Sequence, residues 1–541
     1  MQIMVSGING QDIDVMKKYL DYLAKKASDI DLNKVKEKAS RLSSQAKKAI
    51  DDVDLQKIKD RGRDVVEKAS ELSNEAKKAI DSEKIMADHN IVENVFTSRI
   101  TVGVTGFSRA GKTVFIGALA QALLTADAWS QRRGQGPLAQ FGPFERDQFK
   151  CARIRNDIHS HLPQFPFRQV RNSLTGHETK WPEPTEGISR LVIDLDYSPQ
   201  KHKWVKRNRH IQLELVDYPG EWLVDLPMLG QTYAEWSDLV LAQATRGLRQ
   251  DWSRRYFDEL KELPASPTFD EDVTGRLSEL WTEYLQQATN NGLMRNQPGR
   301  LLRPDTLRHS PILRLAPLPE QQRNNKLGTG MAKRFEDYKK KVIKPFYRDH
   351  FKNMDRQIVL MDVLRTLELG EPAFNELTET LKETLKSFHY GKRGLLSWLG
   401  RAKTSHVLFA ATKADHVVRG DRANLEKMLL RMLSLLDEYN HLRSKTADHQ
   451  VMALASVRAT EDRMTTVSPK REILYGLPEG EKDYGAWDPG GLPLDMPPDW
   501  SAVDFRFFKF EPIPMPNALS EGFPAINLGK ALNFLIRDDF K

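Results

Sequence analysis

The chain has 541 residues, and at about 150 residues per domain this length predicts three or four units. Its 82 lysines and arginines against 74 aspartates and glutamates give a net charge of +8, too small an excess for a dedicated nucleic-acid binder. The single cysteine, Cys151, excludes an internal disulfide, a cysteine-based zinc site and an iron–sulfur cluster. The sequence contains neither an apolar run of membrane-spanning length nor a signal-peptide pattern, so we expect a soluble, cytoplasmic protein.

Residues 1–92 differ in composition from the rest of the chain, because they contain neither proline nor tryptophan and are rich in lysine, glutamate, alanine and serine. A repeat is visible in them: KEKASRLSSQAKKAIDD from Lys36 recurs as VEKASELSNEAKKAIDS from Val66. Apolar residues three and four positions apart predict a repeated amphipathic helical arm. Its alanine-rich seam buries little area, so we expect either two solvated helices packed together or a docking arm for a partner or a membrane surface.

After the arm, predicted strands and helices alternate. In the first part of the chain we expect a strand at 100–104, an apolar helix after a glycine-bounded loop, a helix at 145–161 and strands at 188–197 and 210–218. Helices with polar loops are expected across 226–353. The last part is expected to hold a strand from 357, a helix at 373–387, strands from 406 and from 451, a glycine- and proline-rich surface loop at 476–498, a strand at 505–513 and an amphipathic helix at 527–538. This order predicts an α/β fold with a largely parallel sheet and helices on both faces.

The connection between the strands at 188–197 and 210–218 is basic. It carries Lys201, Lys203, Lys206, Arg207 and Arg209, together with His202 and Trp204. We expect a solvated hairpin tip, with peripheral contact to an anionic membrane as the alternative.

Residues 106–113, GFSRAGKT, fit the pattern G-x-x-x-x-G-K-S/T and lie between an apolar strand and a helix. Backbone N–H groups of such a loop and of the helix N-terminus converge on phosphates, and glycine permits the close approach. Lys112 would bridge the β- and γ-phosphates as a catalytic residue, and the Thr113 hydroxyl would ligate Mg²⁺. The simpler alternative is a strand–helix turn with a surface lysine. The nucleotide-binding residues expected here are Gly106, Ser108, Arg109, Ala110, Gly111, Lys112, Thr113 and Val114.

A second element, D-x-x-G, ends the predicted strand at 210–218. There Asp217 could hold Mg²⁺, usually through water, and Gly220 could offer its N–H group to a γ-phosphate. A further threonine is expected to reach the metal and the γ-phosphate from the segment before the strand at 188–197. Thr185 is the best candidate, with Thr175 and Thr179 as rivals.

A third element, T-K-A-D, ends the strand that begins at 406. The Asp415 carboxylate can accept hydrogen bonds from N1–H and the exocyclic amine of guanine, whereas adenine offers neither donor and would leave a desolvated carboxylate unpaired. The aliphatic stem of Lys413 can pack on the base. Thr412 completes this motif, and Ser456 and Val457, after the next apolar strand, could give the base a backbone N–H.

In this order, these elements resemble the sequence boxes of the GTPase superfamily. More closely, GFSRAGKT, VDYPGEW, IVLMDVL, TKAD, SVRAT, FFKFEP and LGKALNFLIRD resemble the YcjX-like family of bacterial P-loop proteins, from about Arg99 to the C-terminus. The resemblance implies a P-loop NTPase fold, GTP or GDP and Mg²⁺ as cofactors, and a stress-linked role. It also implies a cytoplasmic protein that associates with the inner membrane, either through a membrane-protein partner or through peripheral contact with the membrane. It does not cover the arm.

Three residues qualify the resemblance. Thr412 replaces the usual asparagine, whose amide braces the phosphate loop, so nucleotide affinity is expected to be lower. Glu221 stands where Ras-like proteins carry the glutamine that orients water, and its carboxylate could either activate water or repel the γ-phosphate. Arg109 could neutralise developing charge as an arginine finger in cis, although a solvated or interface arginine is the simpler interpretation.

The spacing between Asp217 and Lys413 is far longer than in small GTPases, which predicts an inserted helical subdomain at 226–355 between GTPase-domain parts at 93–225 and 356–541. The insertion directly follows the D-x-x-G element at Asp217–Gly220, which we call the second switch. We therefore expect the insertion to transmit nucleotide state. The predicted function is Mg²⁺-dependent GTP binding and slow GTP hydrolysis as a switch. The alternatives are an ATPase with the same loop chemistry and a non-hydrolysing GDP/GTP-dependent scaffold protein.

Overall fold

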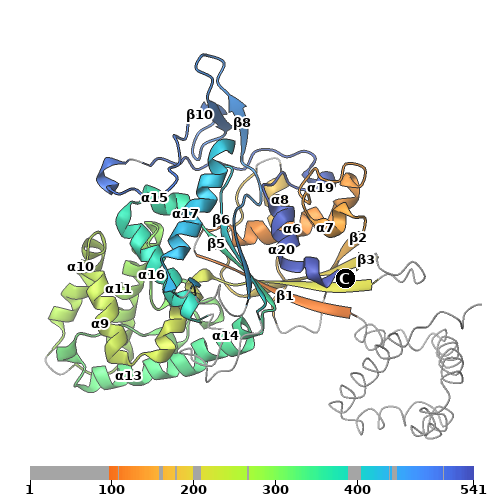
Figure 1. Cartoon of the computed structure of the whole chain (residues 1–541). Coiled ribbons are helices and arrows are strands. Elements are labelled where there is room, and N and C mark those ends of the chain that lie inside the picture. Colours follow the sequence, from red (N-terminus) through yellow and green to blue (C-terminus); the bar gives the residue numbers. More distant parts are fainter. Residues whose placement is uncertain are drawn as a thin grey trace, which may run out of the picture. The chain divides into compact units, whose positions relative to one another are not determined.

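The computed structural model describes residues 97–540, apart from 108, 157–161, 177–178, 199–208, 265–266, 388–403, 438, 441–446 and 504 (Figure 1). The predicted arm, Ser108 and all but the first and last residues of the basic connection therefore lie outside the described residues. Among the described residues, no helix combines the length and the apolar character needed to cross a bilayer.

A seven-stranded sheet forms the centre of the described chain. Its strands are β1 (Thr97–Gly106), β2 (Phe149–Arg155), β3 (Ser189–Tyr197), β4 (Arg209–Asp217), β5 (Arg356–Met361), β6 (His406–Ala411) and β7 (Asp448–Ala453), in the spatial order β2-β3-β4-β1-β5-β6-β7. The five strands from β4 to β7 are parallel, whereas β3 runs antiparallel to both β4 and β2. The predicted α/β P-loop NTPase fold with a largely parallel sheet is confirmed, and the carboxyl ends of the five parallel strands meet at one edge.

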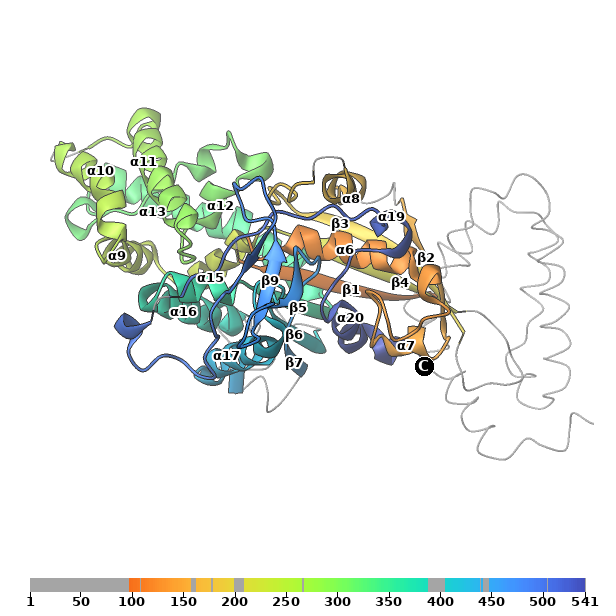
Figure 2. The same cartoon turned by 90° about the horizontal axis from the view of Figure 1, so that it is seen from above.

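Alternate residues of the strands supply two apolar cores, one on each face of the sheet. Val102 and Leu360 face a core that includes α6 (Lys112–Leu124), α8 (Phe167–Thr175) and α20 (Leu528–Ile536). Val359 and Phe409 face the other core, which includes α15 (Val363–Glu368), α16 (Glu371–Ser387) and α17 (Arg422–Ser434). Helices therefore cover both faces, as Figure 2 shows from above.

The predicted insertion is helical, with α9 (Tyr233–Ala244), α10 (Arg249–Glu262), α11 (Glu271–Asn290), α12 (Gly299–Leu302), α13 (Lys326–Tyr338) and α14 (Lys344–Asp349). Polar caps start some of these helices: Thr232 and Glu235 form a capping box before α9, and Asp270 caps α11. Figures 1 and 2 both show α9, α10, α11 and α13 grouped on the side of the sheet away from β2.

The described residues of the insertion share one apolar core with a face of the sheet. Trp236, Trp281 and Phe335 belong to the same buried apolar cluster as the β5 and β6 side chains. A buried ion pair adds to this attachment, because Arg249 of α10 contacts Glu376 of α16 at 2.6 Å. The helices of the insertion thus depend on the sheet for burial, and the subdomain boundary at 226–355 stays a prediction.

The predicted helix at 145–161 is wrong, because β2 occupies Phe149–Arg155 and only the short α7 (Gly142–Glu145) precedes it. β2 is an edge strand whose arginines are paired rather than buried: Arg153 contacts Asp196 and Arg155 contacts Asp194 on β3. A strand with charged residues on a solvated edge lacks the apolar alternation that identifies strands in a sequence.

The C-terminal region also differs from the prediction. The loop predicted at 476–498 contains β10 (Gly485–Trp487), which pairs antiparallel with β9 (Glu472–Gly476), and β9 pairs with β8 (Thr460–Met464). The strand predicted at 505–513 is absent from the described residues of that segment, where Phe510 makes a single bridge to Pro478. Pro512 and its neighbouring prolines cannot donate to a strand ladder, which explains why the aromatic alternation does not extend into a sheet.

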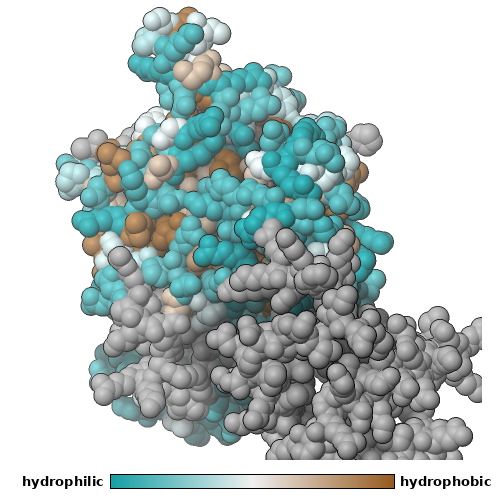
Figure 3. Space-filling view, turned by 45° about the vertical axis from the view of Figure 1, so that its right-hand side comes forward, coloured by the Kyte–Doolittle hydropathy of each residue, from teal (hydrophilic) through white to brown (hydrophobic). Residues whose placement is uncertain are grey.

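The face of the molecule in Figure 3 is largely hydrophilic over the described residues, with separate apolar patches. The most exposed large apolar side chains among those residues are Val467 and Leu248, at 71% and 67% exposure, and they lie far apart in the chain.

Candidate functional site

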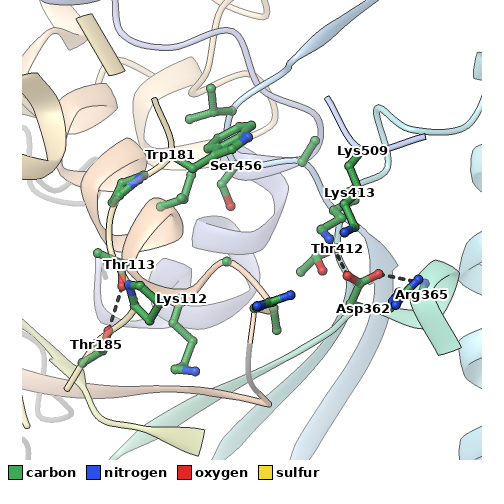
Figure 4. Close-up of a pocket in the computed structure, with 18 of the residues that line it drawn as sticks. Lys112, Thr113, Trp181, Thr185, Asp362, Arg365, Thr412, Lys413, Ser456 and Lys509 are labelled. Atoms are coloured by element: carbon green, nitrogen blue, oxygen red, sulfur yellow. Dashed lines mark hydrogen bonds and ion pairs between the residues drawn. The ribbon is translucent and has the colours of Figure 1, made fainter. Parts of the chain in front are cut away.

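A cavity of about 370 Å³ lies where β1, β5, β6 and β7 end (Figure 4). It brings together residues of the phosphate loop, Glu221 next to the D-x-x-G element, the T-K-A-D element and the segment at 455–457. Predicted site residues in its lining are Arg109, Ala110, Gly111, Lys112, Thr113, Val114, Thr185, Glu221, Thr412, Lys413, Asp415, Ser456 and Val457. Gly106, Asp217 and Gly220 are not part of this lining, but Gly106 contacts Lys112, Asp217 contacts Thr113 and Thr185, and Gly220 packs on Gly106.

The loop after β1 presents an open helix N-terminus to this cavity. Gly111 precedes α6 with a φ of 84°, a left-handed conformation that favours glycine. Among the described residues no side chain caps α6, and its first turn holds no acidic residue, so its N–H groups and dipole are available to an anion. The ammonium group of Lys112 is buried and donates to the carbonyls of Gly106 at 2.8 Å and Phe107 at 3.3 Å.

Behind Lys112, two hydroxyls and one carboxylate form a cluster. Thr185 donates to Asp217 at 2.7 Å, and its oxygen lies 2.8 Å from that of Thr113, a contact drawn in Figure 4. Thr113 also lies 3.5 Å from Asp217. The rival threonines are bonded elsewhere: Thr175 donates to Arg171 within α8, and Thr179 donates to Pro512.

The cluster fits a hard divalent cation. Asp217 is 1% exposed, and its Oδ1 atom has no hydrogen-bond partner among the described residues. Burial raises the pKa of Asp217 to about 6, which a nearby cation would reverse. Two hydroxyl oxygens and carboxylate oxygens are the ligand types that Mg²⁺ prefers.

Gly220 places the second switch directly against the phosphate loop. A Cβ atom on Gly220 would lie 1.9 Å from the carbonyl oxygen of Gly106, so a side chain cannot fit there. Gly220 begins the 3-10 segment η3 (Gly220–Gly230), and Glu221 follows within the cavity lining.

The residues predicted to recognise the base lie on the opposite side of the cavity. One carboxylate oxygen of Asp415, which is 2% exposed, accepts a hydrogen bond from the Ala459 N–H at 2.7 Å. Lys413 adopts a left-handed φ of 60°, and its ammonium pairs with Asp362. The Thr412 hydroxyl donates to the carbonyl of Met361 at 3.1 Å, so it bonds to the end of β5 rather than to the phosphate loop.

Several lining residues were not identified from the sequence. Asp362 directly follows β5, and although burial alone would raise its pKa, Lys413 and the N–H of Arg365 hold that pKa below the ordinary value. Its position after the apolar run IVLM was a usable signal. Trp181 donates to the carbonyl of Phe510 at 2.8 Å, which together with the Thr179 bond ties the Thr185 segment to the C-terminal FFKFEP stretch. No local pattern in the sequence predicts that contact.

The second switch is also joined to the insertion. Within η3, the buried carboxylate of Asp225 accepts the Gly299 N–H at 2.7 Å and the Tyr338 hydroxyl at 2.6 Å. It thereby caps α12 and links it to α13. Arg300 of α12 stacks on the Trp222 ring, with 3.1 Å between the guanidinium carbon and the ring centroid.

Burial raises the pKa of Asp225 to about 6, above its ordinary 3.8, despite these hydrogen bonds. The folded chain therefore binds this proton more tightly than the unfolded chain, and the resulting stabilisation is lost as pH rises through about 6. We therefore compare the unfolding free energy of wild type with that of Asp225→Asn. Relative to the variant, wild type is expected to be up to ~3 kcal/mol more stable at pH about 4 than at pH about 7.5. Urea titrations across this range measure it, and a difference independent of pH would contradict the assignment.

The sequence profile of the YcjX-like family, DUF463, matches residues 100–540. A protein of Escherichia coli (strain K12) named Ras-like GTPase YcjX is 32% identical over 457 residues, which cover 82% of this chain and 96% of that protein. A protein of the same name from Shewanella oneidensis is 30% identical over 461 residues, which cover 81% of this chain and 94% of that protein. The matched residues contain the whole cavity described above. This chain therefore belongs to the YcjX-like family.

Proposed function

We propose that the protein is a guanine-nucleotide switch that binds GTP with Mg²⁺ and hydrolyses it slowly. The observation that carries the proposal is one cavity lined by Lys112, Thr113, Thr185 and Asp415, with the Asp217 carboxylate in contact with both threonine hydroxyls. Phosphate, metal and base recognition each require a different chemistry, and the three groups lie around one space of nucleotide size. The names of the relatives support the same conclusion.

Different residues of the chain bind the phosphates and the Mg²⁺ ion. The N–H groups at the start of α6 and the Lys112 ammonium bind the phosphates, and Gly220 offers its N–H to the γ-phosphate. Thr113, Thr185 and Asp217 would hold Mg²⁺, which when bound neutralises charge on the β- and γ-phosphates. Arg109 borders the same cavity from the loop, and Glu221 borders it from the second switch.

At the other side, Asp415 accepts from the guanine N1–H and exocyclic amine. The hydrogen bond from Ala459 fixes the carboxylate before the base arrives. The stem of Lys413 covers the base plane, while the Asp362 pair fixes the ammonium. Ser456 and Val457 supply the neighbouring backbone. A stress-linked role near the inner membrane stays a prediction from the family resemblance.

Calorimetric titration of the full chain with GDP and with ADP, both with Mg²⁺, tests the proposal. Adenine leaves the buried Asp415 carboxylate unpaired, so we expect GDP to bind at least about 10- to 100-fold more tightly than ADP. Equal affinity for ADP would support the ATPase alternative. Tight GDP binding with GTP turnover at background would support the scaffold alternative.

Replacing Thr185 with valine keeps the branched shape but removes the hydroxyl that contacts Thr113 and Asp217. We expect the Mg²⁺ concentration needed for half-maximal GTP binding to rise by about tenfold, since a hydrogen bond to a charged group contributes ~1.5–3 kcal/mol. Thr175→Val is the matched control, because the Thr175 hydroxyl bonds within α8. Titration of a fluorescent GTP analogue at stepped Mg²⁺ concentrations measures both, and an equal loss in the control would refute the role of Thr185.

A further inference from the structure

The insertion delivers an arginine to the cavity. Arg303 follows α12 directly and lines the same space as Lys112 and Thr185, although it lies far from both in the sequence. Neither the phosphate-loop pattern nor the D-x-x-G pattern includes it. The cavity therefore contains a cation that belongs to the helical insertion rather than to the nucleotide-binding loops.

Contacts with the second switch fix the position of Arg303. Its carbonyl accepts a hydrogen bond from the Trp222 indole at 3.0 Å, and its guanidinium Nε lies 3.6 Å from a carboxylate oxygen of Glu221. The Arg303 and Glu221 side chains are 24% and 10% exposed. The 3.6 Å separation is too long for a good hydrogen bond, so Glu221 attracts the guanidinium without engaging it fully.

α12 packs directly against this switch. A Cβ atom on Gly299 would lie 1.8 Å from the carbonyl oxygen of Glu221, so the two backbones are in direct contact. Asp225 accepts the Gly299 N–H in the same place. Since Gly220 in turn contacts Gly106, an unbroken chain of close contacts runs from the phosphate loop through η3 to Arg303.

Arg109, the other arginine considered for catalysis, is placed differently. Its side chain is exposed and forms no ion pair with any described residue. Arg303 is less exposed and is held beside a carboxylate. A charge with less water around it acts more strongly on a developing charge, so the structure favours Arg303 over Arg109 for this role.

We propose that Arg303 is a catalytic residue of GTP hydrolysis, supplied in cis by the helical insertion, with Glu221 as its partner before the reaction. The inference rests on the proposed function. In the reaction, the water oxygen bonds to the γ-phosphorus while the bond to the β–γ bridging oxygen breaks, and the electron pair stays on GDP. The water proton ends on the released phosphate. The guanidinium moves from Glu221 to the phosphate oxygens, stabilises their developing charge and is unchanged at the end.

The test compares full-length wild type with Arg303→Gln and Arg303→Lys. Single-turnover GTP hydrolysis, affinity for a fluorescent GDP analogue, and formation of a GDP–aluminium fluoride complex are measured for each protein. The aluminium fluoride complex mimics the transferring phosphoryl group, so it reports the cation without depending on turnover. Arg254→Ala is the control, because Arg254 is exposed on α10 and pairs with Asp251.

For Arg303→Gln we expect hydrolysis to fall by about 10³-fold and the aluminium fluoride complex to be lost, while GDP affinity stays within about threefold of wild type. Arg303→Lys retains a charge beside Glu221 and is expected to fold, yet to lose at least about tenfold in rate, because an ammonium lacks the planar fork. Arg254→Ala should match wild type in all three measurements.

A wild-type rate and a wild-type aluminium fluoride complex in either Arg303 variant would overturn the inference. So would loss of the complex in Arg109→Ala with its retention in Arg303→Gln, or a wild-type protein that binds GDP but never forms the complex. In these cases guanine-nucleotide binding still stands. A wild-type protein that binds no guanine nucleotide overturns the proposed function, and this inference with it.

Discussion

Replacing Lys112 with methionine is expected to weaken GDP binding by about 10- to 100-fold, as judged by titration with a fluorescent GDP analogue. The ammonium is the buried cation of the phosphate loop, and a hydrogen bond to a charged group contributes ~1.5–3 kcal/mol. Methionine keeps the length of the side chain but cannot donate, so the carbonyls of Gly106 and Phe107 also lose their donor. We therefore expect a lower unfolding free energy as well.

The matched control is Lys150→Met. Lys150 lies on the exposed edge strand β2 and contacts Asp147, away from the cavity. Its replacement should leave GDP affinity unchanged. Equal affinities for wild type and Lys112→Met would show that the lysine does not contact phosphate and that the loop is an ordinary strand–helix turn.

Replacing Asp415 with asparagine is expected to change which base the protein prefers. Guanine carries an amine at C2, which would face the asparagine amide nitrogen, a donor against a donor. Xanthine carries a carbonyl at the same position, which that amide can satisfy. The asparagine oxygen can still accept from Ala459, so the side chain should keep its orientation.

We expect GDP affinity to fall by about 10- to 100-fold in Asp415→Asn and affinity for xanthosine diphosphate to rise above that of wild type. Competition between the two nucleotides for one fluorescent probe measures both effects. Asp483→Asn, on an exposed turn, is the control. A proportional loss for both nucleotides would indicate structural damage rather than base recognition.

Much of the site could be predicted because parallel strands end at one edge of a sheet. Gly106 and Asp217 end apolar strands and Thr412 follows one, so their motifs had to meet once the strands were identified. The sequence favoured Thr185 but left Thr175 and Thr179 as rivals, because the contact between Thr185 and Asp217 depends on how the segment before β3 lies.

Other features lay beyond sequence reasoning for physical reasons. β2 buries Phe149 but pairs its arginines with β3, and the 505–513 stretch packs aromatics without joining a sheet. Arg303 reaches the cavity only through the tertiary contact between α12 and the second switch. Local periodicity carries no information about a contact of that kind.

The order of the strands has a consequence for biosynthesis. β1 lies between β4 and β5, yet β5 begins only at Arg356, after the whole insertion. At about 5–20 residues per second, roughly 10 to 50 seconds pass between translation of the two strands. Throughout that interval β1 lacks its neighbour β5, and until residue 217 it also lacks β4, while the insertion helices lack the β5 and β6 side chains that complete their core. The nascent chain is therefore most exposed to aggregation before residue 356, when a ribosome-associated chaperone would protect it most.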